Sequence, residues 1–337
     1  MSYLPPMERI DNIDNSGRRI NYLRISVTDR CNLACRYCVP KEQIPLLSHD
    51  KIARYEEILR IVEIAAQLGI TKVRITGGEP FVRKGIFTFL KELGAISGIR
   101  DIGVTTNGVL LEKQLKNILR TNVRRMNISL DTLVPEKFRQ ITGKDHFHQV
   151  WRGIMAANEA GIAPIKLNCV VMRGVNDDEI SDLATLAEKH PFHVRFIEYM
   201  PMGNSAMEQN QEVLVPEIKA AVEKRLGALA PVEPGSFDGP AKRFKPENAP
   251  GEIGFISPVS SHFCHQCNRL RLTSTGRLRP CLLKNDETDI LGPLRRGASP
   301  GELRQIFRTT LKNKPLSHSL DTDQACRISS QMSAIGG

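Results

Sequence analysis

The sequence predicts an α/β fold, an incomplete (βα)6 TIM-like barrel followed by a C-terminal α+β region that closes the barrel mouth. Segments typical of strands and of helices alternate six times in the first two-thirds of the chain, which favours a parallel sheet with right-handed crossovers. Their regular repetition favours a barrel over the alternative, a doubly wound sheet. The pattern changes after residue 230, so we expect a core domain over residues 14–230 and a second domain over residues 231–337.

Six strands are expected in the core, each a short run of apolar or alternating residues. They are Tyr22–Thr28, Val73–Ile75, Asp101–Thr105, Met126–Leu130, Ile165–Val171 and Val194–Ile197. The segments between them have helical periodicity, and the first stops at Gly69, a residue typical of the position after a helix. These helices are Tyr55–Leu68, Ile86–Leu93, Leu111–Leu119, Val150–Ala160 and Glu179–Lys189. Cys169, within the fifth strand, matches no ligand pattern and is expected to be a small core residue.

The C-terminal region has a different pattern. Residues Pro231–Pro250 are rich in Pro and Gly, which predicts a linker. Strands are expected over Ile253–Ile256 and Leu270–Leu278, the second interrupted by a turn. A helix is expected over Glu302–Leu311, and the chain from Pro315 onward is polar and irregular.

The composition is that of a globular protein that can bury a sizeable core. The chain has 337 residues, of which 41% are hydrophobic. We find no apolar segment of a signal peptide and no run of ~18 apolar residues that would predict a membrane span. We therefore expect a cytoplasmic protein with no membrane partner, in which the eight cysteines stay reduced. Clustered cysteines in that compartment more often bind metal or react than form disulfides.

The charge is positive and unevenly distributed. Lys and Arg number 47 against 37 Asp and Glu, a net charge of +10, and the excess is densest in the last third of the chain. A solvated basic surface is the plain interpretation, and an anionic ligand is the sharper one. Nucleic acid is disfavoured as that ligand, because aromatic residues are only 5% of the chain and stacking platforms need them. A phosphorylated small molecule is favoured.

Three cysteines follow the first expected strand with the spacing C-x3-C-x2-C: Cys31, Cys35 and Cys38. Three thiolates on one loop can converge on one metal centre. A structural zinc takes four ligands, whereas three cysteines leave one iron of a [4Fe–4S] cluster open for a further ligand. The cluster is favoured. The alternatives are zinc with a distant fourth ligand and three unpaired structural thiols.

This motif, with Tyr37 before its last cysteine, resembles the signature of radical S-adenosylmethionine enzymes. The resemblance implies a cluster whose open iron binds S-adenosylmethionine and whose electron cleaves it to methionine and a 5′-deoxyadenosyl radical. The protein's part is to position the cofactors and exclude water. The sequence Gly77-Gly78-Glu79-Pro80, after the second strand, resembles the family motif that contacts the methionine amino group.

A second trio, Cys264, Cys267 and Cys281, has the spacing C-x2-C-x13-C. His262 and His265 lie beside it, so a Cys3His zinc site is the alternative. Given the first trio, a second [4Fe–4S] cluster is favoured, and its open iron could hold substrate.

An arginine pair, Arg269 and Arg271, lies on an expected strand between the cysteines of the second trio. Alternation along the strand puts both side chains on one face. Two guanidinium groups beside a metal suit a polyphosphate, because arginine makes fork-like contacts with phosphate. The alternative is an exposed basic strand face.

Together, the two trios, the sequences ITGGEP and CNRLRLTSTGRLRPCL, and the terminal Gly-Gly resemble the GTP 3′,8-cyclase family over nearly the whole chain, from about Asp14. The resemblance implies that one [4Fe–4S] cluster is bound by each trio. Positions that contact S-adenosylmethionine match Tyr37, Gly78, Ser129 and Met200. Positions that contact GTP match Arg24, Arg74, Thr105, Lys166, Arg269, Leu270 and Arg271. Catalytic roles fall on Arg195, near the triphosphate or the radical step, and on the tail residues Gly336 and Gly337, which reach into the active site.

The implied reaction opens molybdenum cofactor biosynthesis. The 5′-deoxyadenosyl radical takes hydrogen from C3′ of GTP, C3′ joins C8 of guanine, and reduction gives 3′,8-cyclo-7,8-dihydro-GTP. An electron donor is implied, and the product passes to cyclic pyranopterin monophosphate synthase. We expect a monomer or a homodimer. The alternatives are another radical enzyme with an auxiliary cluster, such as a peptide-modifying maturase, and a zinc-containing nucleic-acid binder.

Overall fold

A curved sheet organises the whole structure, a computed structural model that describes residues 12–38, 46–200, 211–235, 238–318 and 332–336. The sheet has twelve strands in the order β12-β11-β10-β1-β2-β3-β4-β5-β6-β9-β8-β7. The six core strands are parallel, as predicted. Their bounds are β1 Tyr22–Ser26, β2 Lys72–Thr76, β3 Asp101–Thr106, β4 Arg125–Ser129, β5 Ile165–Val171 and β6 Phe192–Glu198.

The C-terminal region extends this sheet at both edges. The strand β9 (Glu252–Ile256) pairs parallel with β6, and β10 (Arg269–Leu272) pairs parallel with β1. Antiparallel strands follow on each side: β8 and β7 beyond β9, β11 and β12 beyond β10. Their bounds are β7 Leu229–Val232, β8 Lys242–Pro246, β11 Arg277–Arg279 and β12 Thr288–Asp289. The incomplete barrel is confirmed, and the C-terminal region adds a parallel strand to each of its edges.

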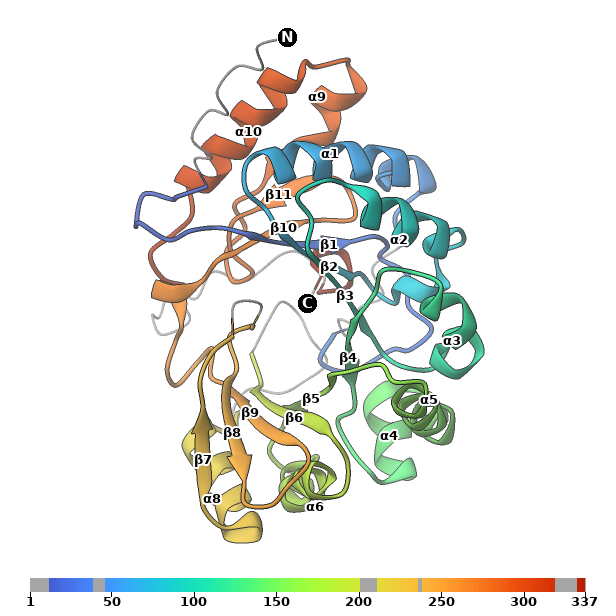
Figure 1. Ribbon diagram of the computed structural model, residues 1–337, viewed down its shortest axis with the longest axis vertical. Helices are drawn as coiled ribbons and strands as arrows, with labels where there is room; N and C mark the ends of the chain where they lie inside the picture. The colour runs from blue at the N-terminus through green and yellow to red at the C-terminus, as the bar shows by residue number, and fades with distance from the viewer. Residues whose placement is uncertain (1–11, 39–45, 201–210, 236–237, 319–331, 337) are drawn as a thin grey trace, which may run out of the picture.

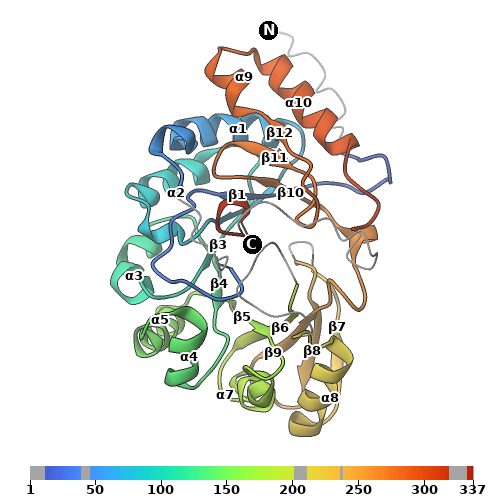
Figure 2. The ribbon, with the colours of Figure 1, turned by 180° about the vertical axis from the view of Figure 1, so that it is seen from behind.

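Helices cover the convex face of the sheet, and only the short α11 (Met332–Ile335), among the helices that the structure describes, lies on the concave side (Figures 1 and 2). The core helices are α1 Tyr55–Gln67, α2 Ile86–Ala95, α3 Leu111–Leu119, α4 Pro135–Thr142, α5 Phe147–Glu159, α6 Ile180–Ala184, α7 Leu186–Lys189 and α8 Val215–Leu226. The later ones are α9 Leu291–Arg295, α10 Pro300–Lys312 and α11 Met332–Ile335. Among the helices that the structure describes, none has the length and hydropathy needed to cross a bilayer.

Three sequence-based expectations need correction. The predicted linker Pro231–Pro250 contains most of the β7–β8 hairpin. Proline is tolerated at position 231 because β7 is an edge strand, and the outer side of an edge strand needs no N–H donor. The predicted helix Glu179–Lys189 is interrupted at Thr185. The irregular tail contains the short helix α11. The predicted domain boundary after residue 230 falls within β7, so the division into two domains stays a prediction.

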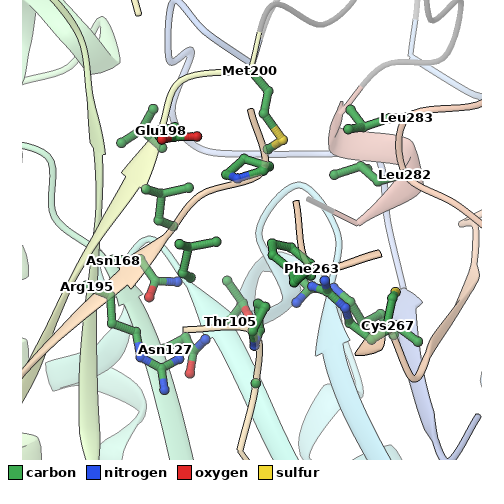
Figure 3. A pocket seen from close by; sticks show the side chains of 18 of the residues that line it. Thr105, Asn127, Asn168, Arg195, Glu198, Met200, Phe263, Cys267, Leu282 and Leu283 are labelled. Carbon is green, nitrogen blue, oxygen red and sulfur yellow. The ribbon is translucent and has the colours of Figure 1, made fainter. Parts of the chain in front are cut away.

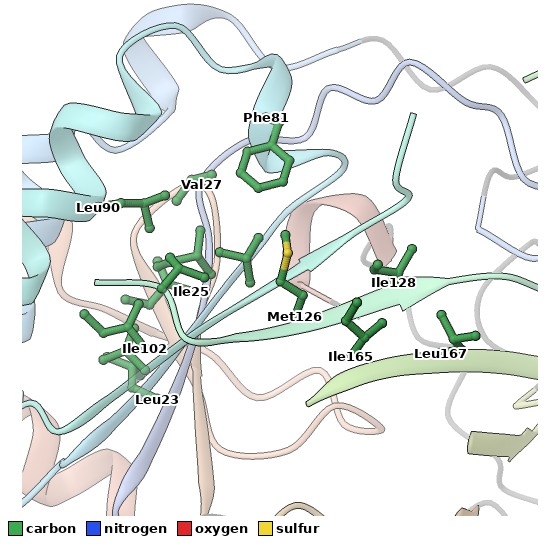
Figure 4. Packing of buried hydrophobic residues seen from close by; sticks show 14 of the residues in the cluster. Leu23, Ile25, Val27, Phe81, Leu90, Ile102, Met126, Ile128, Ile165 and Leu167 are labelled. Atoms are coloured by element: carbon green, nitrogen blue, oxygen red, sulfur yellow. The ribbon is translucent and has the colours of Figure 1, made fainter. Parts of the chain in front are cut away.

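The hydrophobic core lies between the strands and the helices (Figure 4). Alternate residues of each core strand point outward into it, because side chains alternate across a strand. Examples are Leu23, Ile25, Ile102, Met126 and Leu167, all at most 5% exposed. Cys169 belongs to the same cluster, as predicted. The residues in the opposite register point into the barrel, so the same alternation that builds the core also lines the interior.

A buried carboxylate, Glu198, ties the C-terminal region to the end of β6. It is fully buried and accepts hydrogen bonds from the backbone N–H groups of Val215 (2.8 Å), Val259 (2.8 Å) and Ser260 (2.9 Å). These donors belong to the start of α8 and to the segment after β9. One side chain therefore fixes two connections at the rim of the barrel.

Replacing this carboxylate should destabilise the fold. We expect Glu198→Ala to lower the free energy of unfolding by about 3 kcal/mol, because three backbone donors lose their acceptor. Urea denaturation measures the change. The matched control, Glu247→Ala, removes an exposed glutamate and should stay within about 0.5 kcal/mol of the wild type. Equal stability of the two variants would contradict this assignment.

Candidate active site

The concave face of the sheet encloses a cavity of about 280 Å³, near the lower end of ligand pockets (Figure 3). Inward-facing residues of the parallel strands form its wall, and the segments around the second cysteine trio form its other side. Seven cationic side chains line it: Arg24, Lys72, Arg74, Lys166, Arg195, Arg269 and Arg271. Six of the seven were predicted from the sequence, and Thr105, also predicted, lies among them.

Two glycines make room for two of these arginines. Gly103 lies opposite Arg74 in the pairing of β2 with β3, and Gly254 lies opposite Arg195 in the pairing of β6 with β9. A Cβ atom on Gly103 would come within 2.6 Å of the Arg74 guanidinium carbon, and one on Gly254 within 3.1 Å of Arg195 Cγ. The missing side chains therefore let both arginines lie across the neighbouring strand.

The cations destabilise one another's charged forms, which lowers their pKa values. Burial, followed by the charges of Arg195 and Arg74, lowers the pKa of Lys166 to about 7. Burial and Arg74 lower the pKa of Arg195 to about 10. Within the described residues, Nε and Nη2 of Arg195 and Oγ1 of Thr105 are buried without a hydrogen-bond partner. An anionic ligand would balance the buried positive charge and accept hydrogen bonds from these unpaired donors.

Tyr22 lies against two of these cations, Arg74 and Lys72. Arg74 Nε donates to its hydroxyl oxygen at 3.3 Å, and Lys72 Nζ lies 4.5 Å from the ring centroid. Burial raises the pKa of Tyr22, but the charges of Arg74, Arg24 and Lys72 outweigh burial and bring it down to about 6. The three cations therefore favour ionisation of this phenol.

The first cysteine trio lies on the loop after β1, outside the cavity wall. The loop is anchored by backbone hydrogen bonds from Ala34 and Arg36 to the last turn of α4, at 2.9 Å each. Burial, followed by the negative charge of Cys31, raises the pKa of Cys38 to about 12. Burial also raises the pKa of Cys35 well above its usual range, and Cys38 is the next cause. The thiols are close enough to oppose one another's ionisation, so a cationic centre is needed to hold them as thiolates.

The Gly77-Gly78-Glu79 segment is built against this loop. A Cβ on Gly78 would come within 2.2 Å of the Arg30 carbonyl oxygen, so only glycine allows this approach. Gly78 does not itself line the cavity. Glu79 is fully buried and accepts from the N–H of Asn107 at 2.7 Å. The Asn107 side chain lies 3.5 Å from Cys31 Sγ, so the segment reaches the first trio through one residue.

At the cavity rim, Tyr37 donates a hydrogen bond from its hydroxyl to Asp131 at 2.8 Å. Asp131 also accepts from the N–H of Val170 at 2.9 Å, which fixes the tyrosine ring above β4 and β5. Ser129 and Met200 line the same cavity. Three of the four predicted S-adenosylmethionine contacts therefore lie on one cavity.

The second trio lines the cavity directly. Burial raises the pKa of Cys267, but Arg269 and Lys314 outweigh it and bring the pKa to about 6. The pKa of Cys264 is raised, because burial and the neighbouring thiolates Cys281 and Cys267 outweigh a backbone hydrogen bond that lowers it. Of the two, Cys267 ionises more readily and is therefore the better suited to bind a metal.

In neither trio, both of which the structure describes, do the three sulfur atoms lie close enough to bind one shared metal ion. In the described part of the chain, no three His, Cys, Asp or Glu side chains lie close enough to share a single metal ion. A [4Fe–4S] cubane binds each cysteine through a different iron, so its ligands stand further apart than those of one zinc ion. Sulfur-only donors on both loops fit such a cluster.

Some predicted residues lie elsewhere. Leu270 points its side chain into the hydrophobic core, away from the cavity. Gly336 lies outside the cavity wall, but its carbonyl oxygen accepts a hydrogen bond from Arg271. Gly337 lies outside the described residues.

The cavity residues that the sequence analysis missed include four polar ones on the core strands: Tyr22, Lys72, Asn127 and Asn168. Each stands two positions from a predicted site residue on the same strand, so the period of two that paired Arg269 with Arg271 could have found them.

Comparison with known proteins agrees with this geometry. Residues 25–187 match the Radical SAM superfamily, and residues 192–320 match Molybdenum Cofactor Synthesis C. The GTP 3′,8-cyclase of Thermodesulfovibrio yellowstonii is 49% identical over 325 residues, 96% of this chain and 99% of that protein. The GTP 3′,8-cyclase of Moorella thermoacetica is 47% identical over 324 residues, with the same coverage.

Among solved structures, Streptococcus suis SuiB bound to S-adenosylmethionine has a similar fold. The TM-score is 0.60 at 16% identity, covering 84% of this chain and 67% of that one. The full-length similarity to the two cyclases, with both family matches, confirms the resemblance that the motifs indicated: the chain belongs to the GTP 3′,8-cyclase family of the radical S-adenosylmethionine superfamily.

Proposed function

We propose that this chain converts GTP into 3′,8-cyclo-7,8-dihydro-GTP, the first step of molybdenum cofactor biosynthesis. The observation that carries the proposal is one cavity in which seven buried or half-buried cations meet a cysteine trio. A nucleoside triphosphate supplies negative charge to balance these cations, and Tyr37, from the loop of the first trio, lines the same cavity.

The cationic wall binds and orients the triphosphate. Arginine forks make paired contacts with phosphate oxygens, and lysines act as point charges. Arg195 and Thr105 have donors free to turn to the substrate without breaking an existing hydrogen bond. Arg74 is held by Tyr22 and by Asn127 Oδ1 at 2.9 Å, so it is oriented before the substrate arrives. Fixed geometry of this kind limits the side reactions of a radical.

Two [4Fe–4S] clusters and S-adenosylmethionine are the cofactors. Cys31, Cys35 and Cys38 would hold the first cluster, while Gly78, Tyr37, Ser129 and Met200 would contact S-adenosylmethionine. When bound, this pair of cofactors supplies the 5′-deoxyadenosyl radical that removes hydrogen from C3′ of GTP. Glu79 and Asn107 orient the loop of the trio, and Asp131 fixes Tyr37.

Cys264, Cys267 and Cys281 would hold the second cluster, beside which the guanine would lie. Arg269 and Arg271 project from β10 into the cavity next to it. Because the Gly336 carbonyl contacts Arg271, the C-terminal tail approaches the same side of the cavity. We assign the tail residues Gly336 and Gly337, with Arg195, to the reaction itself.

The reaction requires an electron donor. The labile product would be handed to cyclic pyranopterin monophosphate synthase. We place the protein in the cytoplasm, where seven cysteines of the described chain, all of them free, would stay reduced. The quaternary structure would be a monomer or a homodimer.

Anaerobic incubation with GTP, S-adenosylmethionine and dithionite tests the activity. We expect 5′-deoxyadenosine and a cyclised GTP isomer with GTP and not with ATP, read by liquid chromatography and mass spectrometry. Lys166→Met, which removes a buried cavity cation, should raise KM for GTP by at least ~10-fold. Lys144→Met, at an exposed site, should not. Release of 5′-deoxyadenosine at the same rate without GTP would overturn the proposal.

Removing one cysteine from each trio tests the two-cluster assignment. Cys31→Ala and Cys281→Ala should each lose about half of the iron, since each trio would hold a separate four-iron cluster. Metal analysis of anaerobically purified protein measures this, and Cys169→Ala, in the core, is the control. Zinc in place of iron, or full iron in either trio variant, would refute the assignment.

Tyr22 should report the arrival of the triphosphate. Because its pKa is about 6 in the free cavity, iron-free protein should show ultraviolet absorbance of tyrosinate that rises as the pH passes about 6. Tyr22→Phe should lack this transition. GTP brings negative charge to the same cations, so it should move the transition to higher pH, with uptake of a proton. A transition that survives in the Phe variant would show that another tyrosine is responsible.

A further inference from the structure

A lysine beyond the cavity wall joins two segments of the second trio. Lys314 follows α10 and is only 6% exposed. Its Nζ donates to the carbonyl oxygens of Arg269 at 2.8 Å and of Pro280 at 2.7 Å. Arg269 stands two residues after Cys267, and Pro280 directly precedes Cys281. One ammonium group therefore fixes the separation of two of the three cysteine-bearing segments.

Arg18 holds the third segment in the same way. Its Nη1 donates to the Cys264 carbonyl at 2.7 Å, and its Nη2 donates to the Pro315 carbonyl at 2.8 Å. Its Nε forms a buried ion pair with Asp14 at 2.6 Å. The segment after α10 is thus tied to all three parts of the second trio, through Lys314 itself and through the Arg18 contact with Pro315.

The two cations differ in the charge they leave near the sulfurs. The Asp14 carboxylate compensates Arg18, whereas both acceptors of Lys314 in these bonds are neutral carbonyls. Burial lowers the pKa of Lys314, and thiolate charge on Cys267 and Cys281 acts against burial. The influence is mutual, because Lys314 helps to lower the pKa of Cys267. Lys314 therefore places a positive charge within the electrostatic range of two sulfurs.

Around the first trio, in the part of the chain that the structure describes, two acidic residues are among the groups that act on the thiols. Asp131 and Glu79, both acidic, raise the pKa values of Cys35 and Cys31 there, after burial. The two trios thus differ in the charged groups that lie near their sulfurs. Since local charge and hydrogen bonding set the potential of an iron–sulfur cluster, the two sites should have different potentials.

We propose that Lys314 is a positioning residue of the second trio, which sets the spacing of its cysteine segments and raises the reduction potential of the cluster bound there. A nearby positive charge favours the reduced, more negative cluster, so its loss should lower the potential. The proposal rests on the proposed function only for the presence of that cluster.

The test uses the full chain with Cys31, Cys35 and Cys38 replaced by Ala, so that only the second cluster contributes. In this chain, Lys314→Met removes the charge and both donors, and Lys314→Arg keeps them. Lys312→Met, at an exposed position two residues earlier, is the matched control. Iron per chain and the midpoint of one-electron reduction, followed by electron paramagnetic resonance during a dithionite titration, are the readouts.

We expect Lys314→Met to retain less iron, to shift the midpoint to lower potential, or both. Lys314→Arg should restore iron and midpoint toward those of the starting chain, and Lys312→Met should change neither. Unchanged iron and midpoint in the Met variant, or an equal shift in the Lys312 control, would overturn the proposal.

Folding and the presence of the cluster are checked separately. If circular dichroism shows that Lys314→Met is unfolded, Lys314→Gln, which keeps a donor without the charge, is judged by the same criteria. A starting chain that binds no iron would refute the second cluster, and with it this role for Lys314. A starting chain that binds iron, with variants that do not differ, refutes the Lys314 role alone.

Discussion

The burial of like charges inside the barrel is the constraint on which the rest of the structure depends. Seven cations project from β1, β2, β5, β6 and β10 into one cavity, and bringing them together out of water is unfavourable. The fold accommodates them locally: Gly103 and Gly254 give two arginines space, and the Tyr22 hydroxyl accepts a hydrogen bond from Arg74. What remains uncompensated is the driving force for binding a polyanion. The apolar stabilisation lies on the other side of the same strands, in the core between sheet and helices.

The same buried cations give the two cysteine trios different electrostatic surroundings. The second trio borders the cationic wall, and its Cys267 ionises readily. The first trio lies beyond the wall, where its own thiols and nearby carboxylates disfavour ionisation. Identical donor atoms are thereby placed in different electrostatic surroundings. One fold can thus hold two sulfur sites of the same composition whose chemical behaviour differs.

Much of this arrangement could be predicted from the sequence. Strand alternation located the core strands, because a parallel sheet buried on its outer face demands apolar residues at every second position. The C-x3-C-x2-C motif indicated the family, and the Arg269/Arg271 pair indicated two residues that line the cavity. The pairing of β10 with β1 could not be predicted, since its residues lie more than two hundred positions apart and no local pattern encodes the partner. The β7–β8 hairpin resembled a linker for a different reason, its Pro and Gly content, which an edge strand tolerates. The roles of Glu198 and Lys314 stayed hidden because most of their partners are backbone groups, which every residue carries.

The pairing of β10 with β1 also has a consequence for how the protein is made. On the ribosome, β1 emerges early, yet one of its edges lacks a partner until Arg269–Leu272 has been synthesised. Contacts between segments so far apart in sequence form slowly, because a long loop must close first. The nascent barrel therefore spends most of its synthesis with an unpaired parallel edge, the kind of surface that favours aggregation and chaperone binding. Lys314, whose Nζ joins two segments of the second trio, is synthesised later still.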